Sequence, residues 1–343
     1  MCVYSCQQLF CDIITENLRF SGILFPRSER GKFMNSNHVY DMLILGGGPG
    51  GYTAALYAAR AGLDVLVLEK LWAGGQMALT HQIDNYPGFP EGVDGFSLGD
   101  SMRRQAERFG AVTIFTEVTK VNLLDNPKVA EASGERFIAK TVVIATGATP
   151  RHLELAGETE LLGRGVAYCA ACDAMFYKGK CVAVVGGGNS AASDALLLSK
   201  IAAKVILIHR KNTLRAEKID EEALRNAGNV EFRWNSIVTA LLHREKLTGI
   251  QLQDVHSGTE STLECEGLFI SIGRVPATQL FGSQLELAAG GYIPAGETTE
   301  TAIPGVYAVG DVRTKPLRQI VTAMSDGAVA VHMAGEYLSS LQK

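Results

Sequence analysis

Asp41–Lys70 reads DMLILGGGPGGYTAALYAARAGLDVLVLEK, and Cys181–Arg210 reads CVAVVGGGNSAASDALLLSKIAAKVILIHR. The two stretches align without a gap. Each contains a short apolar run, a loop that starts with three glycines, a segment rich in alanine and leucine, and a second apolar run. This order is typical of a strand–helix–strand unit in a parallel sheet. Two copies with different residues at their ends predict an α/β chain with two nucleotide-binding domains.

Two further stretches predict where the chain passes between these domains. Residues 141–150 (TVVIATGATP) and 268–276 (LFISIGRVP) each read as a buried strand that runs into a glycine turn and a proline. Because Gly and Pro break regular structure, we place domain boundaries near Pro150 and Pro276. The predicted fold is therefore two Rossmann-like (three-layer ββα) domains, the second inserted into the first. The segments are an N-terminal extension at 1–39, the first domain at 40–150 and 277–343, and the second domain at 151–276.

The C-terminal part of the chain is expected to return to the first domain. Residues 306–311 (VYAVGD) read as a strand, and an apolar periodicity predicts a helix from about Gln319 to Leu338. The strand ends at Asp311, whose carboxylate could reach a cofactor hydroxyl. Arg318 and Gln319 open the helix, whose positive end could lie beside a cofactor ring.

The bulk composition excludes several classes of protein. The chain has 343 residues, 47% of them hydrophobic, and a net charge of -4. This charge argues against binding to nucleic acid or to an anionic membrane surface. The best apolar run, at 196–208, is interrupted by Lys200 and Lys204 and is too short to span a bilayer. Seven cysteines with one CxxC pair do not resemble a secreted disulfide scaffold, so we expect a cytoplasmic protein.

The first 33 residues contain Cys2, Cys6 and Cys11 but none of the features of a secretory signal. Met34 lies just before residues 35–38 (NSNH), which lead into the first strand pattern, so translation could start there instead. A metal-binding or partner-binding use of the three cysteines stays open, although their spacing matches no familiar ligand set, and we predict no metal site.

The first glycine loop has the pattern Gly46-x-Gly48-x-x-Gly51, with Glu69 at the end of the following strand. Glycine permits the tight turn, the close approach of the backbone to a pyrophosphate, and the contact between helix and strand. The helix N-terminus attracts phosphate charge, and Glu69 would accept hydrogen bonds from ribose hydroxyls. Because strand, loop, helix and acid occur together, we predict a dinucleotide site rather than a glycine-rich turn.

The strand predicted after the second glycine loop is followed by basic residues, where the first copy has an acid. Its predicted nucleotide-binding residues are Gly186, Gly188, Ala191, His209, Arg210, Lys211 and Arg215, of which His209 corresponds to Glu69. A carboxylate would repel a 2′-phosphate, whereas guanidinium and ammonium groups attract it. The second loop is therefore predicted to prefer NADPH over NADH, and the alternative is a solvated basic strand end.

Cys169-Ala170-Ala171-Cys172, followed by Asp173, is the predicted centre of the chemistry. Two cysteines with two residues between them can cycle between dithiol and disulfide, and a nearby acid can carry the thiol proton. The alternative, half of a zinc site, would need a second ligand pair that the sequence lacks. Cys181 and Cys265 lie in apolar, strand-like surroundings and are interpreted as core residues.

The chain resembles the low-molecular-weight thioredoxin reductases, of the class II pyridine nucleotide-disulfide oxidoreductases, from about Tyr40 to its C-terminus. The resemblance rests on six stretches in order: GGQM at 74–77, NYPG at 85–88, ATGA at 145–148, YCAACD at 168–173, HRK at 209–211 and RQIVTA at 318–323. It implies that FAD lies along the first loop and the closing strand. The implied FAD residues are Gly46, Gly48, Gly51, Glu69, Gly75, Gln76, Asn85, Asp311, Arg318, Gln319 and Ile320.

The resemblance also implies a reaction and its partners. Hydride would pass from NADPH to FAD, and electrons would then pass to the disulfide through Cys172, the sulfur nearer the flavin. Cys169 would attack the disulfide of a thioredoxin or a thioredoxin-like protein, with Asp173 as proton donor and acceptor. The family resemblance also implies a homodimer, and a rotation of the inserted domain at Pro150 and Pro276 between the two half-reactions.

Some residues depart from the family pattern. Lys211 stands where a second arginine is usual, which keeps the charge but loses bidentate geometry. Ser193-Asp194 replaces two glutamates, and Met324-Ser325 replaces alanine and glycine. We expect only local effects from the last two changes.

Other functions for the same fold stay open. A flavin-dependent dithiol oxidase would use the same cysteines but would not need the second basic loop. A reductase of another thioredoxin-like protein would keep every motif. Ferredoxin-dependent and flavodoxin reductases fit less well, because the first needs no NADPH and the second needs no CxxC pair. A catalytically silent nucleotide sensor would keep the fold alone.

Overall fold

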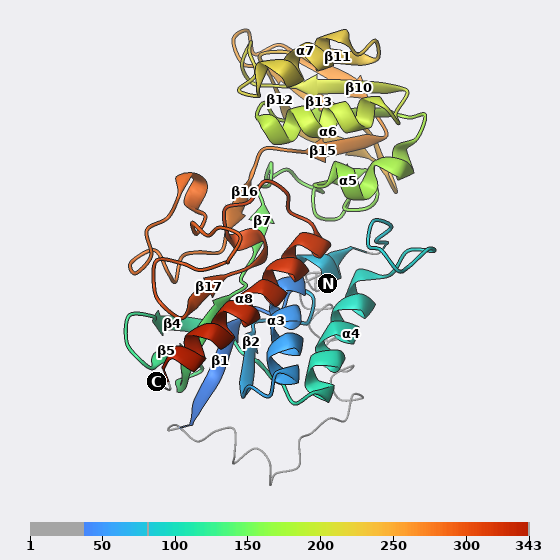
Figure 1. Ribbon diagram of the computed structural model, residues 1–343. Coiled ribbons are helices and arrows are strands. Elements are labelled where there is room, and N and C mark those ends of the chain that lie inside the picture. Colours follow the sequence, from blue (N-terminus) through green and yellow to red (C-terminus); the bar gives the residue numbers. More distant parts are fainter. Residues whose placement is uncertain (1–37, 81, 342–343) are drawn as a thin grey trace, which may run out of the picture.

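The computed structural model describes residues 38–80 and 82–341. Figure 1 shows two α/β bodies, one above the other, joined by a narrow connection. The expectations for Cys2, Cys6, Cys11 and Met34 lie outside the described residues. None of the helices in the described ranges is long and apolar enough to cross a bilayer.

The lower body is built around a seven-stranded sheet. Its strands run in the order β3-β2-β1-β6-β5-β4, with β17 beside β6. Strands β1, β2, β3, β6 and β17 pair in parallel, whereas β4, β5 and β6 form an antiparallel meander. The strands are β1 (Val39–Leu45), β2 (Val65–Glu69), β3 (Val112–Phe115), β4 (Val118–Asn122), β5 (Lys128–Ala132), β6 (Glu135–Ile144) and β17 (Val306–Ala308).

Helices cover one face of the lower sheet, and the meander covers much of the other. Met42 and Ile44 of β1 pack among helical alanines, whereas Leu43 and Leu45 pack against Phe137 and neighbouring residues of the meander. This alternation is what a strand buried on both faces requires. The helices of this body are α3 (Pro49–Arg60), α4 (Gly95–Arg108) and α8 (Ile320–Ser340), with short 3₁₀ helices η1 (Gly75–Leu79), η3 (Ala289–Gly291) and η4 (Gly310–Val312).

The upper body repeats this plan. A parallel five-stranded sheet has the order β11-β10-β9-β15-β8, and a separate antiparallel sheet has the order β12-β13-β14. The parallel strands are β8 (Val166–Ala167), β9 (Cys181–Val185), β10 (Lys204–Ile208), β11 (Val230–Arg233) and β15 (Gly267–Ile270). The other elements are β12 (Ser236–His243), β13 (Leu247–Asp254), β14 (Glu260–Glu264), α5 (Ala170–Asp173), η2 (Ala174–Tyr177), α6 (Asn189–Ser199) and α7 (Lys218–Asn226).

The sequence repeat is also a repeat of strand register. In the lower body Met42 pairs with Val65, and in the upper body Val182 pairs with Val205, which are the matching positions of the ungapped alignment. Both glycine loops therefore leave their sheets at the same height and enter a helix in the same way. The predicted α/β fold with two Rossmann-type domains is confirmed.

The two bodies are joined by a ribbon of two short strands. Strand β7 (Ala148–Pro150) leads out of the lower body, and β16 (Arg274–Pro276) leads back. They pair antiparallel, with Arg274 opposite Pro150 and Pro276 opposite Ala148. The two prolines at which we placed the domain boundaries therefore lie in the same ribbon, at its opposite ends.

Close packing of α8 on α3 supports the first glycine loop. A Cβ atom on Gly327 of α8 would lie 2.3 Å from the carbonyl oxygen of Gly50 and 2.9 Å from the nitrogen of Ala54. Only a residue without a side chain permits this approach of two helix backbones.

We predict that Gly327→Ala separates α3 from α8 and lowers the free energy of unfolding by ~1–3 kcal/mol, because the added methyl group has no space. Gly335→Ala in the same helix is the matched control, since its Cβ would meet nothing within 4 Å. This control should be neutral or more stable by about 0.5–1 kcal/mol. Calorimetric unfolding of both variants measures the difference, and equal melting temperatures would contradict the packing argument.

Candidate active site and cofactor sites

Cys169 and Cys172 form a disulfide at the start of α5. Strand β8 leads directly into this turn, and Cys169 is the residue that caps the helix. The backbone N–H of Cys172 donates to Cys169 Sγ at 3.2 Å, and the N–H of Asp173 donates to the carbonyl oxygen of Cys169 at 3.1 Å. Figure 1 shows α5 on the side of the upper body that faces the lower body. The predicted redox pair is thus assembled in a helical turn between the two bodies.

Asp173 is the acid nearest to this pair in sequence. Burial raises the pKa of its carboxyl group from 3.8 to about 6. Such a group is partly protonated just below neutral pH, so it can both give and take a proton. This is the property that proton transfer to and from a thiol requires.

The first glycine loop makes the close approaches that its glycines predict. Gly46 has a φ of +106°, and a Cβ atom there would lie 2.5 Å from the carbonyl oxygen of Ala145. A Cβ on Gly51 would lie 2.0 Å from the oxygen of Gly46, whereas one on Gly48 would meet nothing within 4 Å. Gly48 starts α3 without a side-chain cap, and the first turn holds no acid. The helix N-terminus therefore presents free N–H groups to open space, which suits a pyrophosphate.

Glu69, the last residue of β2, and the segment after it contact the first glycine loop. The Glu69 carboxylate accepts from the backbone N–H of Gly47 at 2.5 Å and from that of Leu71 at 3.1 Å. The N–H of Gly74 donates to the oxygen of Gly47 at 2.8 Å, which brings Gly75 and Gln76 beside the loop. Glu69 thus stabilises the loop itself. Its carboxylate has lone pairs left for ribose hydroxyls.

The remaining predicted FAD residues gather at the start of α8. Asn85 Nδ2 donates to Gln319 Oε1 at 3.0 Å, although the two residues are far apart in sequence. Gln319 caps α8, and Ile320 is its first residue. The Arg318 guanidinium lies over the Tyr292 ring, 4.2 Å from its centre, and reaches the carbonyl oxygen of Asp311.

Asp311 itself lies in a mostly buried position. Burial raises the pKa of its carboxyl group, while the charges of Arg274 and Arg318 oppose the rise. Arg274 Nη1 lies 3.9 Å from Asp311 Oδ2. A carboxyl group held in this way can accept a hydrogen bond from a hydroxyl of a bound cofactor.

A buried ion-pair network that the sequence did not reveal holds the Asp311 turn. Asp326 of α8 accepts from the Arg313 guanidinium at 2.7 and 2.9 Å, from Lys315 Nζ at 2.7 Å and from the N–H of Gly310 at 2.8 Å. Burial alone would raise the pKa of Asp326, but the hydrogen bonds from Arg313 and Lys315 outweigh it and hold the pKa below its ordinary value. In the sequence Asp326 is a single acid among the mostly apolar residues 320–335, and no local pattern marks it as buried.

The second glycine loop repeats the geometry of the first. A Cβ on Gly186 would lie 2.3 Å from the oxygen of Ser271, and one on Gly188 would meet nothing within 4 Å. Gly188 starts α6 without a side-chain cap or an acid in the first turn, and Ala191 is buried in that helix. The N–H of Arg215 donates to the oxygen of Gly187 at 2.6 Å, so the basic segment folds back over the loop.

The structure separates His209 from the other basic residues. His209 is 6% exposed, packs against Gly187, and its Nε2 has no hydrogen-bond partner within the described residues. Burial and the nearby charges of Arg215 and Arg210 lower its pKa, so the ring is neutral near pH 7. Arg210, Lys211 and Arg215 are exposed and form no ion pair within 38–80 or 82–341. These three are left to attract a phosphate.

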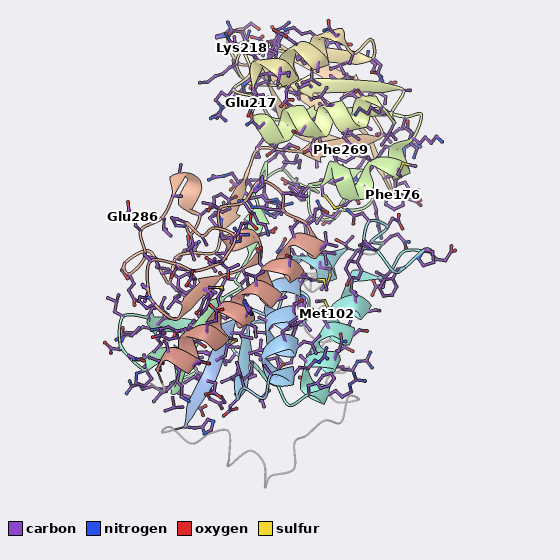
Figure 2. The ribbon with its side chains drawn as sticks, in the orientation of Figure 1. Met102, Phe176, Glu217, Lys218, Phe269 and Glu286 are labelled. Atoms are coloured by element: carbon purple, nitrogen blue, oxygen red, sulfur yellow. A yellow bond between two sulfur atoms is a disulfide. The ribbon has the colours of Figure 1, made fainter. Side chains whose placement is uncertain are left out.

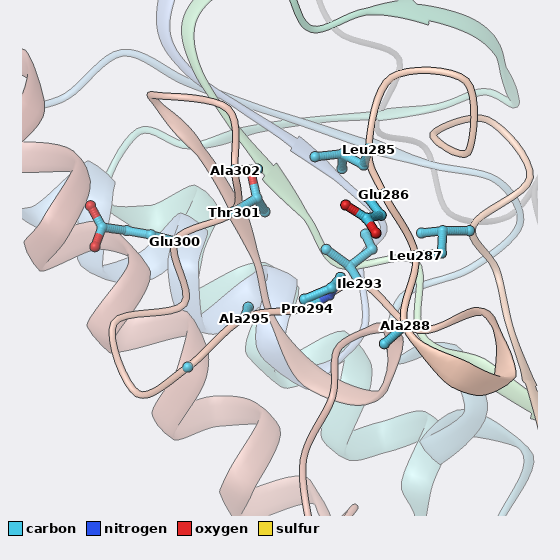
Figure 3. Close-up of a pocket in the computed structure, with 11 residues that line it drawn as sticks. Leu285, Glu286, Leu287, Ala288, Ile293, Pro294, Ala295, Glu300, Thr301 and Ala302 are labelled. Atoms are coloured by element: carbon cyan, nitrogen blue, oxygen red, sulfur yellow. The ribbon is translucent and has the colours of Figure 1, made fainter.

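A pocket of about 460 Å³ lies elsewhere, in the lower body. Figure 3 shows it between the loops around Leu285, Ile293 and Thr301. None of the predicted cofactor residues lines it. Across the described ranges, no group of three or more His, Cys, Asp or Glu side chains is arranged to hold a metal ion.

The sequence matches known proteins over most of its length. Residues 40–327 match the pyridine nucleotide-disulphide oxidoreductase family. A thioredoxin reductase of Treponema pallidum is 40% identical over 304 residues, which cover 88% of this chain and 98% of the relative. A bifunctional thioredoxin reductase/thioredoxin of Mycobacterium leprae is 41% identical over 88% of this chain and 66% of the relative.

Solved structures are similar as well. The thioredoxin reductase of Streptococcus pyogenes superimposes with a TM-score of 0.83 at 39% identity, over 89% of this chain and 99% of that one. The thioredoxin reductase of Lactococcus lactis in its FR conformation gives a TM-score of 0.62 at 36% identity, over 88% and 99% of the two chains.

The raised pKa of Asp173 has a measurable consequence for stability. Between the ordinary pKa of 3.8 and about 6, the folded protein binds this proton more tightly than the unfolded chain. The contribution of Asp173 to stability therefore falls as the pH rises from 4 to above 6. We predict that Asp173→Asn, which cannot ionise, gains stability relative to wild type over this range, by at most about 3 kcal/mol, and that the gain is constant above pH 7.

Urea unfolding of the oxidised proteins at pH 4, 5, 6 and 7.5 measures this difference. Effects of pH on other groups cancel between the two proteins. A difference that does not change with pH would show that the pKa of Asp173 is ordinary.

Proposed function

The chain belongs to the pyridine nucleotide-disulphide oxidoreductase family and, within it, to the thioredoxin reductases, and we propose that it uses NADPH to reduce the disulfide of a thioredoxin. The observation that carries this proposal is the Cys169–Cys172 disulfide, held in a helical turn on the side of the upper body that faces the lower body. The strand that follows the first glycine loop and its helix ends in an acid, Glu69, whereas the corresponding strand after the second loop leads into a cluster of exposed cations. This combination suits two nucleotides of different charge and one exchangeable disulfide.

The cysteines and Asp173 have separate roles in the proposed reaction. The Cys169 thiolate attacks one sulfur of the partner disulfide, which breaks that bond and forms a mixed disulfide. The Cys172 thiolate then attacks Cys169 Sγ, which releases the partner as a dithiol and restores the Cys169–Cys172 bond. Asp173 takes the proton from a thiol and gives it to the leaving thiolate. Each turnover moves two electrons, supplied by one NADPH.

Two sets of residues would hold the cofactors. The first loop, Glu69 and the start of α8 would bind FAD, and the second loop with Arg210, Lys211 and Arg215 would bind NADPH. Bound FAD would supply the two-electron redox centre between the nicotinamide and the disulfide. The free helix N-termini at Gly48 and Gly188 support both assignments, since each accepts a phosphate without displacing a side chain.

Exposed apolar side chains beside the disulfide support a protein partner. Met175 and Phe176 directly follow the redox turn and are 62% and 50% exposed. Figure 2 shows Phe176 on the upper body near the disulfide. Such a surface suits contact with the apolar surroundings of a protein disulfide. The thioredoxin part named in the M. leprae relative supports thioredoxin as that protein. A homodimer and a cytoplasmic location remain predictions, which sedimentation and cell fractionation would test.

The ribbon of β7 and β16 is the proposed hinge for domain rotation. The solved relatives from S. pyogenes and L. lactis have similar identity and coverage but TM-scores of 0.83 and 0.62. A different angle between two unchanged bodies would produce such a difference. Two short strands between two large sheets offer little resistance to this rotation.

We predict that a covalent crosslink between the two bodies abolishes one of the two half-reactions and leaves the other, because only one orientation remains. The measurements are reduction of the flavin by NADPH and reduction of the Cys169–Cys172 disulfide by the prereduced flavin. Retention of both at normal rates would rule out the hinge.

The function itself is tested by absorbance of the flavin in the anaerobic purified protein. NADPH should bleach the flavin, and oxidised thioredoxin should restore its colour in wild type. In Cys172→Ser, NADPH should still bleach the flavin but thioredoxin should not restore it, because no internal disulfide can form. Recovery with oxygen and not with thioredoxin would instead indicate a dithiol oxidase, and recovery only with another protein disulfide would indicate a different partner.

Two controls belong to the same titration. NADH should bleach the flavin at a higher concentration than NADPH. In Arg210→Ala this difference should shrink, whereas the exposed and distant Lys246→Ala should keep it. A wild-type protein that responds equally to both nucleotides would remove the role given to the basic cluster.

A further inference from the structure

Glu158 is a buried carboxylate that the proposed reaction does not use. The residue is 3% exposed and lies in the segment between the ribbon strand β7 and the redox turn. Its carboxylate accepts from the backbone N–H of Leu153 at 3.1 Å and from that of Leu155 at 3.2 Å. It also contacts the Tyr168 hydroxyl and, at 3.2 Å, His152 Nδ1. Nearly all of its lone-pair positions are therefore in use.

These contacts fix where the protons lie. Burial would raise the pKa of Glu158, but the hydrogen bonds from Tyr168 and from the two backbone groups outweigh it, and the pKa lies below its ordinary value. An ionised carboxylate can only accept, so the Tyr168 hydroxyl donates to it. The Tyr168 oxygen then accepts from His152 Nδ1 at 2.6 Å. The hydroxyl of Tyr168 is held from both sides.

Tyr168 directly precedes Cys169; the chain bends at Tyr168, just after β8, and the backbone of Cys169 is extended. The side chains of this stretch lie on opposite faces of the sheet. Val166 and Tyr168 pack on the face that the β12-β13-β14 sheet covers, whereas Ala167 and Ala170 pack on the face of the helices. Fixing the ring of Tyr168 on one face of the sheet therefore restricts the orientation of the adjacent Cys169 side chain.

We propose that Glu158 is a positioning residue for Cys169: through Tyr168 it holds the attacking sulfur in place, and through Leu153 and Leu155 it ties this sulfur to the ribbon between the two bodies. The inference rests on the proposed function and adds a residue to it. Glu158 touches neither sulfur, so its effect passes through Tyr168. It should act on thiol–disulfide exchange and not on reduction of the flavin.

The test uses Tyr168→Phe and Glu158→Gln in the full-length flavin-loaded protein. Tyr168→Phe keeps the ring and removes the hydroxyl, and Glu158→Gln replaces one acceptor by a donor. Glu160→Gln is the matched control, because this glutamate is exposed in the same segment and forms no ion pair in the described part of the chain. The rates to measure are NADPH oxidation with ferricyanide, which bypasses the cysteines, and NADPH oxidation with thioredoxin.

The expected result is a split between the two rates. Both variants should keep the ferricyanide rate within about 2-fold and lose about 10-fold or more of the thioredoxin rate, because small displacements of an attacking atom cost rates of this order. The control should keep both rates. Unchanged thioredoxin rates would overturn the proposal, and so would a parallel loss of both rates, which would indicate general structural damage.

A second measurement separates this proposal from the proposed function. In protein reduced with dithiothreitol, iodoacetamide should label Cys169 at least about 3-fold more slowly in Tyr168→Phe than in wild type. The reason is that a displaced Cys169 loses the hydrogen bond from the N–H of Cys172, seen at 3.2 Å, which stabilises a thiolate. If wild type reduces no thioredoxin, the proposed function fails. Even in that case, equal rates of Cys169 labelling in wild type and in Tyr168→Phe would contradict the positioning role proposed for Glu158.

Discussion

The pairing of β7 with β16 is the constraint on which both halves of the molecule depend. The chain leaves the lower sheet at Ala148 and returns to it at Pro276, and these two residues face each other in the ribbon. Because the exit and the return are paired, the inserted body can fold without separating β6 from β17, which lie on either side of the insertion in sequence. The proposed FAD site draws on both sides of the insertion, since Glu69 and Asn85 precede it in sequence and the Asp311 turn follows it.

Buried charge organises each half around its own site. In the lower body Asp326 holds Arg313 and Lys315 beneath the Asp311 turn. In the upper body Glu158 holds Tyr168 and two backbone groups beside the redox pair. A buried carboxylate is costly unless every lone pair has a donor, so each network tolerates little displacement. Rigid surroundings of this kind would keep the reacting atoms in place during the proposed rotation of the two bodies.

The amino-acid sequence by itself determined the elements that depend on local chemistry. Three-glycine loops, each between an apolar run and an alanine-rich run, are enough to predict two strand–helix–strand units, because the turn and the close helix approach exclude larger residues. The paired strands even keep the same register, since the repeat has no gap. Cys169 and Cys172 were found from their spacing alone. The contrast between Glu69 and the cations after the second loop predicts that the two loops bind different nucleotides.

Only the tertiary structure decided which distant residues share a site and which polar groups are buried. His209, Arg210 and Lys211 are adjacent in sequence, yet His209 is buried and neutral while its neighbours are exposed. Nothing in the sequence around Asp326 and Glu158 distinguishes them from acids at the surface. Their hydrogen-bond partners lie on other elements or across a turn. Burial and long-range hydrogen bonds arise when separate segments pack together, so no local pattern can reveal them. The spacing of residues in the sequence was enough to identify the cysteine pair and the glycine loops, whereas tertiary packing decided which charged groups are buried.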